Sequence, residues 1–290
     1  MVLTGDVGVP RASSGRYFCK TDDNDLLIDH SRKQLSLAFP PEKTMFAVTE
    51  NRLRCYEDAL DSVPGGNIMV EPHDNGTTFA IMYSLMRLSA SDPDATVVYF
   101  PADLRAHDAE CIRAGVRHAL EAERHLPGLI LLGLAPRTPT DAREWIVPDV
   151  SAPIHETLNV WRVLRFSEAG SHSEATELST RGGLVNSSVV VGNIPTFLRA
   201  VRAARPDLYD AFENIGPAIG TPGEAAKVAG IYNAEYPESD FARDVLASIA
   251  VDLAVVPVPA VKAKGVARRL PAAWSERTAA IGTLAAAAGA

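Results

Sequence analysis

Asp103 is the residue of this 290-residue chain whose type and position point most directly to chemistry. It closely follows the apolar run Ala95–Phe100 (ATVVYF), which is rich in residues that favour β-strands. A carboxylate at the C-terminal end of a strand suits Mg²⁺, which takes few protein oxygens together with phosphates. An aspartate is also common at the start of a loop or as a helix cap, so the surrounding sequence has to decide.

Two glycines near the N-terminus, Gly5 and Gly8, form a second candidate site. Because they carry no side chain, they let backbone N–H groups approach a phosphate closely. Two glycines after a strand are, taken alone, more often a simple turn.

Strand and helix patterns alternate along the first half of the chain, and they must position these residues. The apolar runs of strand length are Met45–Thr49, Asn67–Val70, Ala95–Phe100 and Leu129–Leu134. Helical spacing of apolar residues lies between them, at Thr77–Leu88 and at His107–Arg124, where Asp108 is a candidate N-cap. This alternation predicts an α/β fold with a Rossmann-like, doubly wound, mostly parallel sheet. Binding sites in such sheets lie beyond the carboxyl ends of the strands.

After about residue 135 the pattern changes, and prolines and polar residues become more frequent. Asn159–Phe166 and Leu184–Val191 are predicted to be strands, the former in antiparallel or mixed pairing. Ile194–Phe212 is predicted to be helical with a break at Pro206.

The composition limits the classes of protein that fit. With 47% hydrophobic residues the chain can bury a sizeable core, but its longest apolar stretch, Leu246–Val261, is interrupted by Asp252, Pro257 and Pro259. The N-terminus lacks a secretory signal pattern, and three widely spaced cysteines argue against disulfides and zinc. The net charge of −8 comes without a basic stripe. We therefore expect a soluble cytoplasmic protein with no membrane or nucleic-acid partner.

Six short motifs follow one another along the chain. They are Leu3–Gly8 (LTGDVG), Val70–Ile81 (VEPHDNGTTFAI), Phe100–Asp103 (FPAD), Leu132–Pro139 (LGLAPRTP), Phe166–Glu168 (FSE) and Leu184–Ser187 (LVNS). Each motif alone is weak. Their order and spacing resemble the sugar-1-phosphate nucleotidyltransferases, and most of all the mannose-1-phosphate guanylyltransferases, with the best match from Met45 to Phe212.

The resemblance implies a fold of the nucleotide-diphospho-sugar transferase type and a reaction. A sugar 1-phosphate, with mannose 1-phosphate favoured, would attack the α-phosphorus of a nucleoside triphosphate, with GTP favoured, and release pyrophosphate. Mg²⁺ would be the cofactor. The resemblance implies one domain over residues 1–275, with a nucleotide-binding half (1–135) and a sugar-binding half (136–275), and an Ala-rich tail (276–290). The oligomeric state stays open, a homo-oligomer included.

The resemblance also assigns residues to the nucleotide. Gly5 and Gly8 would bring backbone N–H groups to the phosphates, and Asp103 would hold Mg²⁺. Arg11 is displaced by one position from the family's arginine, and Arg16 stands where the family has a lysine. Both would take up charge on the triphosphate, although an ordinary surface arginine explains Arg16 equally well.

Glu71, followed by Pro72, Gly76 and Thr77, would meet the base. A carboxylate can accept from both the N1–H and the exocyclic amine of guanine, which selects that base. The alternative is that Glu71 and Pro72 are simply the exit of a strand.

On the sugar side, Glu168 would accept hydroxyl protons and Asn186 could both donate and accept. The chain departs from the family here: Ala169 replaces the lysine expected after the glutamate, and Glu144 stands where a glycine is expected. Arg143 could restore a positive charge, although Arg143 and Glu144 are more simply a solvated pair.

The family's second metal aspartate is not found at its expected place, and Asp240 is a weaker candidate for which a helix N-cap role before Phe241–Ile249 is at least as good. Because several cationic and metal positions are altered, two functions remain. We favour an active enzyme. The alternative is a catalytically inactive homologue that binds a nucleotide or a sugar phosphate, or acts as a regulatory protein. An unrelated Rossmann-like enzyme fits less well, since no G-x-G-x-x-G is present.

Overall fold

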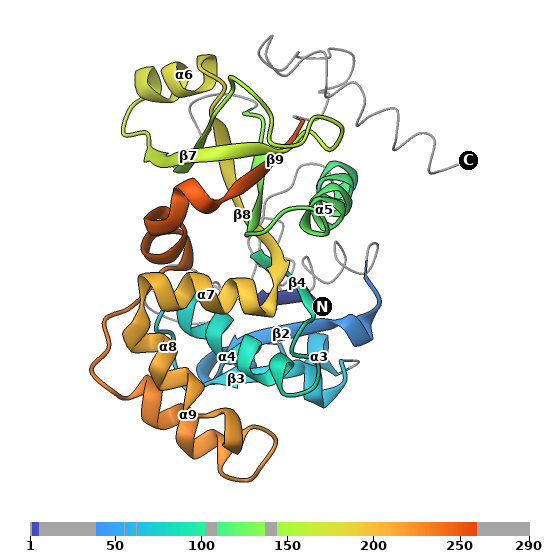
Figure 1. The fold of residues 1–290 in the computed structure, drawn as a ribbon. Helices are drawn as coiled ribbons and strands as arrows, with labels where there is room; N and C mark the ends of the chain where they lie inside the picture. Colours follow the sequence, from blue (N-terminus) through green and yellow to red (C-terminus); the bar gives the residue numbers. More distant parts are fainter. Residues whose placement is uncertain are drawn as a thin grey trace. The chain divides into compact units, whose positions relative to one another are not determined.

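The computed structural model describes residues 2–5, 39–54, 56–61, 63–101, 109–136 and 144–259. Their elements group into two compact units (Figure 1). The first contains the described residues up to 101 together with 193–248, and the second contains 109–192 together with 249–259. Helices and strands occur in both units, so the predicted α/β class is confirmed. The division into nucleotide-binding and sugar-binding halves remains a prediction.

The first unit contains a parallel sheet with the strand order β3-β2-β1-β4. Its strands are β1 (Val2–Gly5), β2 (Thr44–Thr49), β3 (Ile68–Glu71) and β4 (Thr96–Pro101). The strand β2 is buried along its whole length, as expected for a parallel strand that is covered on both faces. The strands predicted from the apolar runs at Met45–Thr49, Asn67–Val70 and Ala95–Phe100 are therefore confirmed.

The helix α4 (Thr77–Ser89) packs against β1 and β2 and also against α7 (Ile194–Ala204) and α8 (Pro206–Glu213). Because it is covered on several sides, it buries residues around most of its circumference instead of along one stripe. The break predicted at Pro206 is confirmed, since this proline opens α8, where no backbone N–H is needed.

Several shorter helices complete the first unit. They are α2 (Glu50–Leu53), α3 (Glu57–Leu60) and α9 (Glu224–Tyr232), the 3₁₀ helices η2 (Pro41–Lys43), η3 (Gly65–Asn67) and η5 (Gly216–Ala218), and the π-helix η6 (Phe241–Val245). A separate apolar cluster joins Phe46 and Val48 of β2 to Tyr56, Leu60 and Val63. This cluster fixes the segment between β2 and β3 to the sheet.

The second unit contains a mixed sheet with the strand order β8-β5-β9-β7-β6, and β6 also pairs with β8. Its strands are β5 (Ile130–Leu134), β6 (Glu144–Pro148), β7 (Trp161–Glu168), β8 (Leu184–Asn193) and β9 (Ala254–Val258). Only the pairing of β5 with β9 is parallel among these strands, while β5–β8, β6–β7, β6–β8 and β7–β9 are antiparallel. The predicted change from parallel to mixed pairing after residue 135 is confirmed.

Two helices lie among the described residues of the second unit, together with the 3₁₀ segment η7 (Leu246–Asp252) at its border. The helix α5 (Ala109–Glu123) packs against β5 and β9, and the approach is close at Gly115. A Cβ atom there would lie 2.7 Å from Val258 Cγ2, so only glycine fits without a shift. The helix α6 (His172–Thr180) begins at Ser171, whose side chain accepts a hydrogen bond from the Glu174 N–H.

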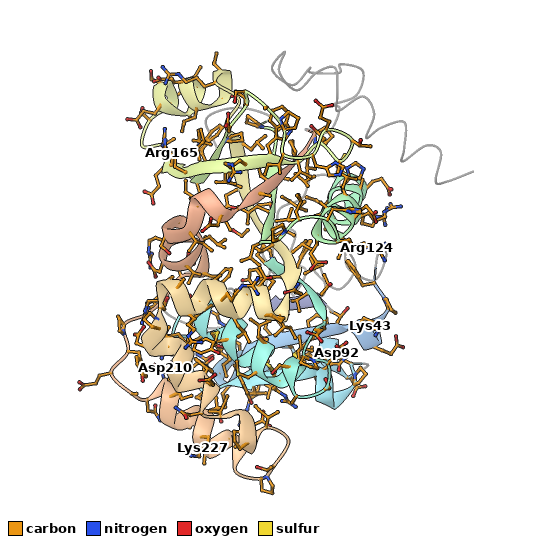
Figure 2. The ribbon with its side chains drawn as sticks, in the orientation of Figure 1. Lys43, Asp92, Arg124, Arg165, Asp210 and Lys227 are labelled. Atoms are coloured by element: carbon orange, nitrogen blue, oxygen red, sulfur yellow. The ribbon has the colours of Figure 1, made fainter. Side chains whose placement is uncertain are left out.

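Charged side chains of both signs lie on the surfaces of the two units, among them Lys43, Asp92, Arg124, Arg165 and Lys227 (Figure 2). Within the described part of the chain, no helix has both the length and the apolar character that a membrane crossing needs.

Candidate functional site

The carboxyl ends of the parallel strands meet at one edge of the first unit's sheet. Gly5 at the end of β1 is in register with Ala47 of β2 and with Pro101 at the end of β4, and Thr49 is in register with Glu71 at the end of β3. Three motifs of the sequence therefore leave the sheet at the same edge. In open α/β sheets this edge is where ligands bind, so it is the candidate site of the first unit.

Glu71 is the last residue of β3 and has no solvent-exposed surface. Its Oε2 atom accepts a hydrogen bond of 2.6 Å from the Tyr232 hydroxyl, and Tyr232 lies at the end of α9. Burying a carboxylate is costly unless it is hydrogen-bonded, and this bond offsets part of the cost. A base that contacts this carboxylate must replace groups that now cover it.

The segment after Glu71 is fixed by further contacts with the same end of α9. The carbonyl oxygen of Tyr232 accepts a hydrogen bond of 3.0 Å from Asn75 Nδ2 and lies 2.9 Å from His73 Nε2. The Tyr232 ring also packs edge-on against the His73 ring, with 5.7 Å between ring centroids. The loop between β3 and α4 is thus tied to a residue that is 161 positions away from Glu71 in the chain.

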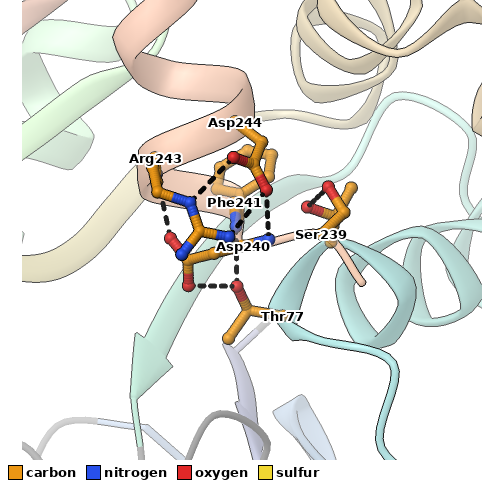
Figure 3. Close-up of polar contacts among 7 residues, drawn as sticks. Thr77, Ser239, Asp240, Phe241, Arg243 and Asp244 are labelled. Atoms are coloured by element: carbon orange, nitrogen blue, oxygen red, sulfur yellow. Dashed lines mark hydrogen bonds and ion pairs between the residues drawn. The ribbon is translucent and has the colours of Figure 1, made fainter. Parts of the chain in front are cut away.

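Thr77, the first residue of α4, is hydrogen-bonded to Asp240 and Phe241 (Figure 3), and Gly76 precedes it. Gly76 has φ 92° and ψ 165°, a backbone conformation that is almost exclusive to glycine. A Cβ atom at this position would lie 2.3 Å from the Ser239 carbonyl oxygen. Thr77 Oγ1 accepts a hydrogen bond of 2.7 Å from the Phe241 N–H and donates one of 3.1 Å to Asp240 Oδ2.

Asp240 caps the π-helix η6, because its Oδ1 atom accepts from the Arg243 N–H at 2.9 Å. The N-cap interpretation of this aspartate is therefore confirmed. Arg243 forms an ion pair with Asp244, with 2.9 Å between Nε and Oδ1 (Figure 3). Hydrogen bonding to Arg243 holds the pKa of Asp244 below its usual range, so this carboxylate stays charged and accepts from the Asp240 N–H at 2.8 Å.

In the second unit, both predicted sugar-binding residues lie beside Glu144. Glu168, at the end of β7, is in register with Glu144 of β6, and Asn186 of β8 makes a long hydrogen bond of 3.4 Å from its Nδ2 atom to Glu144 Oε2. Glu144 and Glu168 are exposed and Asn186 is partly exposed. The structure thus brings Glu168 and Asn186 together with the glutamate that replaces the family's glycine.

A local irregularity in β8 orients Asn186. Its Oδ1 atom accepts a hydrogen bond of 3.0 Å from the Ser188 N–H, and Ser188 has φ 57°, in the left-handed region. The pairing of β5 with β8 shifts register between Leu131 and Gly133, opposite this segment. Such irregularities re-aim side chains at sheet rims. With Oδ1 bound to the backbone, the Asn186 amide is fixed with its Nδ2 group toward Glu144.

Four of the predicted site residues, Gly8, Arg11, Arg16 and Asp103, lie outside the described residues, and their roles stay predictions. Gly5 is described as the end of β1. Within the described ranges, no group of three or more His, Cys, Asp or Glu side chains is arranged to hold a metal ion. The predicted Mg²⁺ site at Asp103 lies outside these ranges and stays a prediction.

Sequence reasoning missed Tyr232 and Ser239, which hold the Glu71–Thr78 segment in place. Both are buried polar residues, and Ser239 donates a hydrogen bond of 2.9 Å from its Oγ atom to Thr78 Oγ1. Neither belongs to one of the six motifs. No local pattern could have found them, because each acts on residues that are 161 positions away.

Neither a protein-family model nor the sequence of a curated protein matches this chain. Several solved structures do match this chain in fold. A Thermus thermophilus protein described as mannose-1-phosphate geranyltransferase is 21% identical, with a TM-score of 0.71 over 89% of this chain and 73% of that protein. Mannose-6-phosphate isomerase from Helicobacter pylori is 16% identical, with a TM-score of 0.64 over 89% and 96%.

A third protein, HddC from Yersinia pseudotuberculosis, is 9% identical, with a TM-score of 0.51 over 88% of this chain and 89% of HddC. In all three comparisons the sequence identity is low, while the similarity in fold covers most of each chain. The resemblance to sugar-phosphate nucleotidyltransferases that the motif order indicated is therefore confirmed for the fold, with the divergence in sequence that the altered motifs suggested.

Proposed function

We propose that the protein transfers a nucleotidyl group from a nucleoside triphosphate to a sugar 1-phosphate and releases pyrophosphate. GTP is the favoured donor and mannose 1-phosphate the favoured acceptor. The proposal includes a Rossmann-like, doubly wound arrangement of the nucleotide-diphospho-sugar transferase type. Its support is the likeness in fold to a protein described as acting on mannose 1-phosphate, combined with the motif order in the sequence.

The single observation that carries the proposal is the common edge at which β1, β3 and β4 end. The chain continues from these ends into the glycine-containing loop at Gly5 and Gly8, the base segment Glu71–Thr77, and the loop with Asp103. Nucleotidyl transfer needs a phosphate site, a base site and a metal carboxylate close together. The order of the strands in this sheet supports such a grouping.

In the proposed reaction each group has a separate task. Backbone N–H groups at Gly5 and Gly8, with Arg11 and Arg16, balance the charge of the triphosphate. Mg²⁺ held by Asp103 would neutralise charge on the phosphates during the displacement. Glu71 accepts hydrogen bonds from guanine, while Pro72, Gly76 and Thr77 shape the base site.

The sugar 1-phosphate is proposed to bind through Glu168 and Asn186. Glu168 accepts hydrogen bonds from sugar hydroxyls, and Asn186 donates from its Nδ2 group, whose orientation is fixed because Oδ1 accepts from the Ser188 N–H. Both residues lie on strands that border β6 in the second unit. An acceptor and a donor that flank Glu144 suit a polyhydroxylated ligand.

One observation favours a second candidate function, a catalytically inactive homologue that binds nucleotides or sugar phosphates. Glu144 places a carboxylate between Glu168 and Asn186 and takes a hydrogen bond from the Asn186 amide. A negative charge at this place opposes the phosphate of a sugar 1-phosphate. The two candidates share the nucleotide site and differ in turnover.

The nucleotide preference tests the proposed base site. We expect isothermal titration calorimetry to show tighter binding of GTP than of UTP, because a carboxylate matches the guanine N1–H and amine. Replacing Glu71 with glutamine is expected to reduce this preference by about tenfold, since a hydrogen bond to a charged group is exchanged for one to a neutral amide.

Glu224→Gln is the matched control, because Glu224 is also buried and also accepts from a tyrosine hydroxyl, that of Tyr83, at 2.7 Å. It should cost stability and leave the nucleotide preference unchanged. Equal or tighter binding of UTP by the unaltered protein would remove the guanine assignment.

A further inference from the structure

Both residues of the Glu71–Tyr232 pair are buried. Glu71 is 0% exposed and Tyr232 is 2% exposed, and the 2.6 Å hydrogen bond joins the end of β3 to the end of α9. In a site of low polarity such a bond to a carboxylate is stronger than it is in water. It therefore fixes the direction of the Glu71 carboxylate.

Tyr232 acts on the rest of the base segment as well. Its carbonyl oxygen accepts a hydrogen bond from the Asn75 amide and lies within hydrogen-bond distance of His73 Nε2. Its ring packs edge-on against Phe79 of α4, with 5.3 Å between ring centroids. One residue thus contacts the strand end, the loop and the helix that follows. Rotation of the Tyr232 side chain would break its contacts with the strand end and with the helix.

The Tyr232 hydroxyl remains a hydrogen-bond donor across the physiological pH range. Burial raises the pKa of this phenol well above its usual value, and the charges of Glu71 and Asp74 and the neighbouring Tyr83 raise it further. A protonated phenol donates to Glu71 in every state that a nucleotide would meet. The orientation of the carboxylate is therefore constant, which preorganises it for a ligand.

We propose that Tyr232 is a positioning residue that sets base selectivity, because its hydroxyl orients the Glu71 carboxylate and its backbone carbonyl holds the loop at His73 and Asn75. This inference rests on the proposed function. The residue acts through Glu71 and the loop without touching the base. The proposed role makes α9, which lies far from this motif along the sequence, part of the nucleotide site.

The test is Tyr232→Phe, which removes the hydroxyl and keeps the ring. The matched control is Tyr83→Phe, which removes a second buried tyrosine–glutamate hydrogen bond in the described part of the first unit, from Tyr83 to Glu224. Affinities for GTP and UTP are measured by calorimetry, and unfolding by urea. We expect both variants to lose stability and only Tyr232→Phe to lose GTP affinity, by about tenfold, with UTP affinity changed less than about twofold.

The outcomes separate the inference from the function on which it rests. If the unaltered protein binds GTP more tightly than UTP and Tyr232→Phe keeps that ratio, the positioning role is wrong and the proposed function stands. If the unaltered protein shows no preference for GTP, the positioning role and the guanine assignment are both overturned, while the nucleotidyl transfer itself is decided by pyrophosphate release.

Asn75→Ala provides a second variant should Tyr232→Phe fail to fold, because it removes one donor to the Tyr232 carbonyl and leaves the Glu71–Tyr232 pair intact. A GTP-to-UTP ratio that falls in this variant supports the role of Tyr232 in holding the loop. An unchanged ratio overturns it.

Discussion

Gly76→Ala is expected to lower the free energy of unfolding by about 2–5 kcal/mol, as the sum of two separate costs. The backbone at φ 92° is strained for any residue with a side chain, at roughly 1–2 kcal/mol. The added methyl group would also lie 2.3 Å from the Ser239 carbonyl oxygen and force the two segments apart, at about 1–3 kcal/mol. Urea unfolding followed by circular dichroism measures the sum.

Two other glycines of the first unit separate these costs. Gly220 has φ 75°, and a Cβ atom added to it would meet no atom within 4 Å, so Gly220→Ala should show the backbone cost alone. Gly66 has open space and no such φ, so Gly66→Ala should be close to neutral. If Gly76→Ala proves no more destabilising than Gly220→Ala, the close contact with Ser239 does not constrain the base segment.

Asp103→Asn is expected to reduce turnover by at least about two orders of magnitude, the size typical for loss of a key electrostatic stabiliser. Asparagine keeps the size and much of the hydrogen bonding of aspartate but removes the charge that would balance Mg²⁺. No other carboxylate in the sequence matches the family's position after a strand end. Pyrophosphate release is measured at saturating substrates over a range of Mg²⁺ concentrations.

Asp92→Asn is the control for this substitution, since Asp92 is exposed and lies before the same strand, β4. Its activity should equal that of the unaltered protein. Full activity of Asp103→Asn would refute the metal role of this aspartate, provided that circular dichroism shows both variants to be folded.

Most elements of the fold could be predicted because their patterns are local. The strands β2, β4 and β5 are short apolar runs, and α4 and α5 show helical spacing. The strand β9 was missed because Pro257 interrupts its pattern. Pro257 is tolerated in the strand because β9 pairs with β7 at Ala254 and Val255, before the proline. The capping residues Ser171 and Glu174 were a usable signal for α6.

The candidate site could be predicted only in part, for a physical reason. Motif order located Glu71, which ends β3, and Gly76 and Thr77, which stand at the start of α4. It could not show that Tyr232 and the segment Ser239–Phe241 hold them, since these contacts join residues more than 150 positions apart. Long-range contacts of this kind depend on how α9 and η6 pack, and no local spacing encodes that packing.

The most direct test of the proposed nucleotidyl transfer is an assay of pyrophosphate release. The protein is incubated with Mg²⁺, each nucleoside triphosphate in turn and a panel of sugar 1-phosphates, and the nucleotide products are separated by chromatography. The account predicts pyrophosphate and a nucleotide sugar in equal amounts, fastest with GTP and mannose 1-phosphate. Binding of GTP without pyrophosphate from any pair of substrates would contradict the enzymatic claim and leave the inactive homologue as the function.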